Sequence, residues 1–243
     1  MEIEKMKRCF YDRAMGTVFY DLQRGTRSTI EVAVLPGGDV RVRAPRQMTE
    51  AAVRRFLKEK APWIKEQTEK ARNEQKEWME KRFRDGSTFY YLGRPLTLAS
   101  RKSEGKTVWR EGALLLIDQK VASPQKRREY IEKWYRGLAK ETIERRVRYF
   151  AGRVGESPNK VTVKTQKKRW GSCSSLRNLN FNWKLIMMPQ EIMDYVVVHE
   201  LCHLKEMNHS DSFWKLVGDV LPDYRKCREW LKYNAWKVEW EQR

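Results

Sequence analysis

Two histidines lie four residues apart inside an apolar segment of the second half of the chain. His199 and His203 flank Glu200 in the pattern HExxH, and residues 195–198 and Leu201 around them are apolar. Because residues four apart share one face of an α-helix, we expect a buried helix that directs both imidazoles to one point. Burying such polar groups without partners is costly, so the segment predicts a metal site on a core helix.

The chain has only three histidines, and the third, His209, follows His203 by six residues. Three imidazole ligands leave the fourth position of a tetrahedral zinc ion open, as in catalytic zinc sites. Glu200 lies about 100° around the helix from His199, where it can accept a proton from a metal-bound water without binding the metal. Cys202 points away from that face and is expected to be a buried thiol. The pattern therefore predicts a hydrolytic zinc centre.

The first half of the chain is divided into short apolar segments by turn residues, which is typical of β-hairpins. The expected strand pairs are 28–35 with 40–44, 89–92 with 95–99, and 107–110 with 113–117. A helical stretch from Thr49 to Arg84 lies between the first two pairs, with Thr49 as its cap and Pro62 as an interruption. No internal sequence repeat is evident.

The second half has the spacing of long helices with a few strands. A helix is expected from Pro124 to about Arg153, strands at 161–165 and 179–186, and helices from Pro189, near Ser210 and near Pro222. The fold class predicted is α+β. Two domains are expected. Residues 1–120 form a β-rich N-terminal domain with an inserted helix, and residues 121–243 form a mostly helical catalytic domain with a small sheet.

Several motifs in this order resemble the YgjP-like metal-dependent hydrolases, relatives of the zincin peptidases that also share motifs with SprT-like proteins. The residues that carry the resemblance are 169–175 (RWGSCSS), 180–185 (NFNWKL), 194–204 (DYVVVHELCHL), 208–210 (NHS) and 213–214 (FW). Upstream segments such as 41–45, 62–64 and 92–94 extend it over nearly the whole chain. The resemblance implies a zincin-like catalytic domain in which His199, His203 and His209 bind zinc and Glu200 is the catalytic base.

Residues before and within the strand at 179–186 are candidates for substrate contacts. Zincins commonly place a strand beside the active helix, where its free backbone edge can pair with an extended peptide. On this reasoning Arg169, Ser172, Asn180 and Asn182 are expected to face the substrate. The alternative is that residues 171–174 form only a tight turn and that both amides satisfy backbone groups.

Charge leaves the substrate class open. The chain has 51 Lys and Arg against 32 Asp and Glu, a formal net charge of +19. Five basic residues occur without an acid just before Trp170: Lys160, Lys164, Lys167, Lys168 and Arg169. Three functions follow: a zinc metallopeptidase, a zinc-dependent nucleoside triphosphate pyrophosphatase, or a nucleic-acid-associated protein with a secondary zinc site. The partners expected are a peptide or nucleotide substrate, with nonspecific polyanion binding through the basic surface.

Composition limits the class of protein and the cellular compartment that we expect. Hydrophobic residues make up 40% of the chain, too many for a disordered protein, while the longest apolar runs are too short to cross a bilayer. Four widely spaced cysteines and a charged N-terminal segment favour a reducing compartment, so a cytoplasmic location without membrane association is expected.

Overall fold

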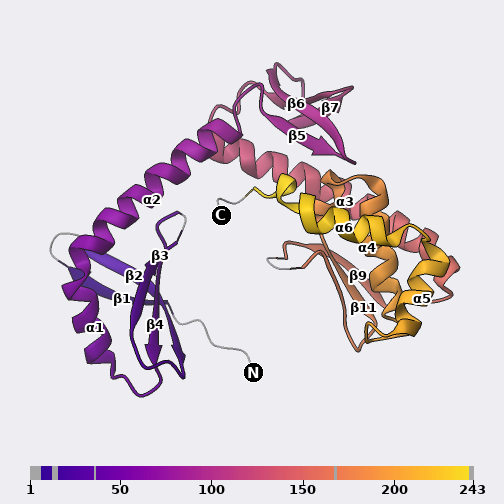
Figure 1. The fold of residues 1–243 in the computed structure, drawn as a ribbon. Helices are drawn as coiled ribbons and strands as arrows, with labels where there is room; N and C mark the ends of the chain where they lie inside the picture. The colour runs from indigo at the N-terminus through magenta and orange to yellow at the C-terminus, as the bar shows by residue number, and fades with distance from the viewer. Residues whose placement is uncertain (1–6, 13–15, 36, 167–168, 241–243) are drawn as a thin grey trace. The chain divides into compact units, whose positions relative to one another are not determined.

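The computed structural model describes residues 7–12, 16–35, 37–166 and 169–240 (Figure 1). Contacts between Cα atoms divide the chain into a unit that ends at Lys81 and a second unit that comprises Arg82–Trp240. Strands come first and helices dominate later, which confirms the predicted α+β class. None of the helices in the described ranges combines the length and the hydrophobicity that a membrane crossing requires. The predicted domain boundary near residue 120 stays a prediction.

The first unit is a four-stranded sheet covered by two helices. Its elements are β1 (Lys7–Asp12), β2 (Gly16–Gly25), β3 (Glu31–Val34), β4 (Val40–Pro45), α1 (Glu50–Glu59) and α2 (Ala61–Arg82, which reaches the second unit). The predicted hairpin is confirmed as the antiparallel pair β3 and β4, although Pro36 of its turn lies outside the described residues. Thr49 caps α1 by accepting the Ala52 N–H at 3.2 Å, and a break after α1 separates it from α2, which contains Pro62. Val42, Val53 and Leu57 are fully buried between sheet and helix.

The second unit begins with another four-stranded sheet. It contains β5 (Thr88–Tyr91), β6 (Arg94–Arg101), β7 (Val108–Glu111) and β8 (Leu114–Asp118). Both predicted hairpins, β5–β6 and β7–β8, are confirmed. The strand order β5-β6-β8-β7 matches the order β1-β2-β4-β3 of the first sheet, and in each sheet the two central strands are parallel. The two sheets therefore share one topology, although the sequence shows no repeat.

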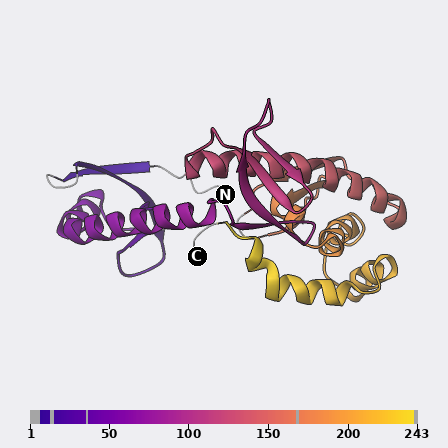
Figure 2. The ribbon, with the colours of Figure 1, turned by 90° about the horizontal axis from the view of Figure 1, so that it is seen from above.

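The remainder of the second unit is helical with a small sheet. It comprises α3 (Pro124–Val154), β9 (Lys160–Lys164), β10 (Gly171–Cys173), β11 (Asn178–Asn182), the 3₁₀ helix η1 (Trp183–Met187), α4 (Gln190–Cys202), α5 (Asp211–Val220), α6 (Tyr224–Asn234) and η2 (Ala235–Val238). The small sheet has the order β10-β11-β9. Figure 2 shows α3 and α6 on opposite sides of the layer that holds α4. The core helix with the histidines is thus enclosed by helices on two sides.

The predicted strand at 179–186 is wrong over its last four residues. The strand ends at Asn182, and residues 183–187 form η1. Asn182 causes this change because its side-chain oxygen accepts the Lys184 N–H at 3.1 Å, which caps the new helix. Trp183 enters the aromatic core against Trp240, with ring centroids 5.1 Å apart. Lys184 is buried and pairs with Glu239 at 2.6 Å, so Glu239 is held against this turn.

Candidate metal centre

Contacts at both ends of α4 determine where its side chains point. At its start, the Leu92 N–H donates to the Ile186 carbonyl at 2.8 Å, and a Cβ on Gly93 would lie 2.9 Å from Pro189, so only glycine permits this close approach. Further along, Asp194 accepts two hydrogen bonds from Arg146 of α3, at 2.6 and 2.8 Å. Burial raises the pKa of Asp194, and the guanidinium of Arg146 opposes this shift. The bidentate pair fixes α4 on α3.

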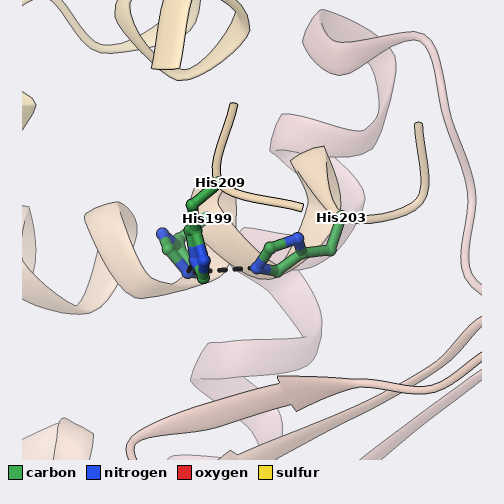
Figure 3. Close-up of side chains that lie close together, drawn as sticks. All are labelled: His199, His203 and His209. Atoms are coloured by element: carbon green, nitrogen blue, oxygen red, sulfur yellow. Dashed lines mark hydrogen bonds between the residues drawn. The ribbon is translucent and has the colours of Figure 1, made fainter. Parts of the chain in front are cut away.

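The three histidine side chains meet at one point (Figure 3). His199 lies on α4, His203 caps its C-terminus, and His209 lies just before α5. The Nε2 atom of His199 is 3.2 Å from Nε2 of His203 and 3.0 Å from Nε2 of His209. Two nitrogens bound to one tetrahedral zinc ion at its usual bond length are about 3.3 Å apart. Two of the three pairs are close to this distance, and all three donors lie within 4.8 Å of one another, so a small adjustment would let them bind one ion.

The protonation of the imidazoles also fits a metal site. The Nδ1–H of His203 donates to the backbone carbonyl of Glu206 at 2.9 Å, which leaves the Nε2 lone pair directed at the other two rings. Burial lowers the pKa of His199 to about 3, with a further contribution from His203 and His209. Burial likewise lowers the pKa of His203. Neutral imidazoles are the form that binds metal ions.

Aromatic rings of α5 hold the histidines in place. Phe213 stacks on His203 with ring centroids 4.5 Å apart, and Trp214 stacks on His209 at 5.6 Å. The predicted helix start is confirmed, because Ser210 accepts the Phe213 N–H at 3.3 Å. This cap turns the chain directly after His209, so the third histidine is positioned by the start of α5.

Glu200 lies against the strand β10. A Cβ on Gly171 would come within 2.5 Å of the Glu200 Oε1 atom and 2.8 Å of its Cδ. Gly171 therefore leaves the space that the carboxylate occupies. Glu200 is buried, and this burial raises its pKa to about 8, while the positive charge of Arg169 acts in the opposite direction. The raised pKa is appropriate for a group that accepts a proton near neutral pH.

The strand β10 forms one edge of the small sheet within the described part of the chain. The Asn182 N–H donates to the Trp170 carbonyl, and the Ser174 N–H donates to the Asn178 carbonyl. Since hydrogen bonding alternates along an antiparallel pair, Gly171 and Cys173 direct their backbone N–H and C=O groups away from β11. The outward edge of β10 thus passes beside Glu200. Residues 171–173 are a strand, so the expectation of a tight turn at 171–174 is wrong.

The four predicted substrate contacts occupy different surroundings. Arg169 is exposed, and its charge reaches Glu200. Ser172 accepts a hydrogen bond from Asn180 at 3.4 Å, and both alternate with Gly171 and Phe181, so they lie on the sheet face opposite Glu200.

The side chain of Asn182 is used in hydrogen bonds within the fold. It is 2% exposed and donates to the backbone carbonyls of Gln166 and Arg169, at 2.9 and 3.4 Å. These bonds agree with the alternative that its amide satisfies backbone groups, and a substrate contact by Asn182 stays a prediction. Lys167 and Lys168 of the basic segment lie outside the described residues.

Two features of this centre were not predicted. We did not predict that the missing side chain of Gly171 leaves room for Glu200. A glycine in the sequence does not indicate which side chain will approach it in the fold. The stacking of Trp214 on His209 was also missed, although the position of an aromatic pair directly after the cap Ser210 was a usable signal.

The chain matches a known family over most of its length. The family model described as YgjP-like, metallopeptidase domain matches residues 28–234. A search of curated proteins found no match. Among solved structures, the chain is similar to the crystal structure of the metallopeptidase zymogen of Pyrococcus abyssi abylysin, with 24% identity and a TM-score of 0.34, over 37% of this chain and 94% of that chain.

Proposed function

Because this chain belongs to the YgjP-like metallopeptidase family, we propose that it is a zinc-dependent hydrolase of peptide bonds. Membership implies a metal ion, and the three converging histidines are the donors that fit one. The observation that carries the proposal is the contact of Glu200 with the edge strand β10 at Gly171. It brings together a buried carboxylate, imidazole donors and a backbone edge suited to an extended peptide.

In this proposal each side chain has one role. His199, His203 and His209 hold the ion, which when bound polarises the scissile carbonyl and lowers the pKa of a water molecule. Glu200 accepts the proton of the attacking water and later delivers it to the leaving amine. Phe213 exposes no surface to solvent and helps to exclude bulk water from one side of the centre.

The edge of β10 aligns the substrate. An extended peptide pairs with the outward N–H and C=O groups of Gly171 and Cys173, as in other cases of strand addition. This pairing brings the scissile bond next to Glu200, because the Glu200 carboxylate lies against Gly171. Backbone pairing contributes affinity without specifying side chains.

Replacing Gly171 with alanine is expected to displace the Glu200 carboxylate without unfolding the protein. The three heavy atoms nearest to the new Cβ all belong to the Glu200 side chain (Oε1, Cγ and Cδ), so we expect this side chain to move before the strand does. A misplacement of about 1 Å at a reacting group costs roughly 100-fold in rate. Gly171→Ala should therefore lose peptide hydrolysis while it keeps one zinc per chain and an unchanged circular dichroism spectrum.

The matched control is Gly152→Ala on α3, where an added Cβ has no atom within 4 Å. Equal activity of Gly171→Ala and Gly152→Ala would contradict the positioning role of Gly171.

The acidic limb of the pH–rate profile is expected to depend on Arg169. Its positive charge lowers the pKa of Glu200, whose main shift is an increase caused by burial. Arg169→Ala removes this charge, so the pKa of Glu200 rises and activity appears only at higher pH. The displacement of the limb should shrink at high salt, because Arg169 is exposed and screened. A limb that stays in place, or moves to lower pH, would show that Arg169 does not act on Glu200.

The test of the proposed function sets the competing substrates side by side. Zinc-loaded protein is incubated with a mixture of unstructured peptides and, in parallel, with nucleoside triphosphates. We expect new peptide termini by mass spectrometry, with one oxygen from isotopically labelled water in each new carboxylate. Hydrolysis of triphosphates with no peptide cleaved would overturn the peptidase proposal in favour of the nucleotide alternative.

A further inference from the structure

Arg228 of α6 belongs to the surroundings of the three histidines. Its guanidinium carbon lies 4.9 Å from the centroid of the Trp214 ring, and Trp214 stacks on His209. Trp214 also lies against His199, with ring centroids 5.9 Å apart. A cation from the last helix therefore faces the metal centre.

Within the described residues, no ion pair neutralises this cation. Lys226, two residues earlier, pairs with Asp223 at 2.8 Å. By contrast, no carboxylate in the described ranges lies within 4.0 Å of the Arg228 guanidinium, and Arg228 is exposed. The aromatic ring supports the guanidinium on one face, while its N–H donors remain available.

A second donor lies against the same group of histidines. Tyr195 is four residues before His199 on α4, and the two ring centroids are 5.9 Å apart. Its side chain is 5% exposed, and among the described residues its hydroxyl has no hydrogen-bond partner. The phenol hydroxyl of Tyr195 can donate a hydrogen bond.

We infer that Arg228 and Tyr195 form a carboxylate-binding subsite beside the metal centre, which selects substrates with a carboxylate near the scissile bond. The inference rests on the proposed function. A guanidinium presents paired N–H donors that match the two oxygens of a carboxylate, and a phenol hydroxyl supplies one more. The net charge of +19 favours the approach of such substrates from solution.

The carboxylate has two sources, an acidic side chain or the C-terminus of a peptide, and paired probes separate them. Each fluorescent peptide is prepared with Glu or Gln next to the scissile bond, and with a free or an amidated C-terminus. Binding is measured by anisotropy on zinc-loaded Glu200→Gln protein, which is not expected to cleave the probes. Cleavage of the same peptides by the Glu200 protein is measured separately.

Arg228→Gln, added to the Glu200→Gln protein, keeps most of the stem on Trp214 and removes the charge. We expect it to weaken binding of one carboxylate-bearing probe about 10- to 100-fold and to leave its neutral counterpart unchanged. Arg228→Lys should restore part of the loss, since it keeps the charge without the paired donors. Tyr195→Phe should cause a smaller loss on the same probe. Lys226→Ala, which removes one charge from the same helix, should have no effect.

If Arg228→Gln weakens binding of the Glu probe, the subsite binds an acidic side chain. If it weakens binding of the probe with a free C-terminus, the subsite binds a terminal carboxylate. Equal weakening of charged and neutral probes, or an equal effect of Lys226→Ala, overturns the subsite. Unchanged binding of every probe to Arg228→Gln overturns the subsite as well. The proposed function fails by a different result, namely no peptide cleaved by the Glu200 protein.

Discussion

Glutamine in place of Glu200 is expected to retain one zinc per chain and the native fold while hydrolysis falls by roughly two to four orders of magnitude. Gln has nearly the same shape as Glu, so it fills the space beside Gly171 without accepting a proton. The Glu200 carboxylate is not one of the three converging donors, so its loss leaves the histidine set intact. Peptide cleavage and metal content are measured on the same sample, so that a loss of catalysis is distinguished from a loss of zinc.

The control for this variant is Glu191→Gln. Glu191 lies in the first turn of the same helix and is exposed, so the identical chemical change is made away from the centre. We expect Glu191→Gln to retain activity. If Glu200→Gln cleaved every substrate at the original rate, Glu200 would not be the base, and the proposed mechanism would fail.

Removal of His209 is expected to abolish tight metal binding. A three-ligand site has no spare donor, and changes to groups that merely support a ligand already cost about 10- to 100-fold in affinity. His209→Ala should therefore lose more than about 100-fold in zinc affinity in a chelator competition titration. His209 is exposed and comes from outside α4, so its removal tests the assignment without disturbing the buried helix.

Asn208→Ala is the matched control for His209→Ala. It changes the neighbouring residue of the same segment and leaves all three imidazoles in place. Unchanged stoichiometry and affinity in His209→Ala would show that the third ligand is another group. Loss of zinc by both variants would indicate that the segment, and not the His209 ring, determines binding.

Local chemistry in the sequence was sufficient to predict many elements. The turns at residues 92–93 and 112–113, each with a glycine at positive φ, specify the hairpins β5–β6 and β7–β8, because the residues that set the backbone angles lie between the strands they join. The cap Thr49 and the helix start near Ser210 were predicted for the same reason, since each side chain bonds a backbone group three residues away. The pair His199 and His203 follows from the period of the helix alone.

Contacts between distant segments could not be predicted in this way. The parallel pairs β2–β4 and β6–β8 join strands that no turn connects directly, so only packing of the completed sheets selects them. The end of β11 at Asn182 depends on a side-chain bond that competes with continuation of the strand.

The sequence by itself determined that three imidazole donors and a separate carboxylate lie close together, because His199, Glu200 and His203 share one helix and His209 follows within one short segment. Tertiary structure alone decided what surrounds those donors. Gly171 comes from a strand that precedes α4, and Arg228 comes from a helix that follows it. Gly171 reaches Glu200 and Arg228 reaches Trp214 because strands and helices pack in three dimensions, where the shapes of the packed surfaces matter and sequence separation does not.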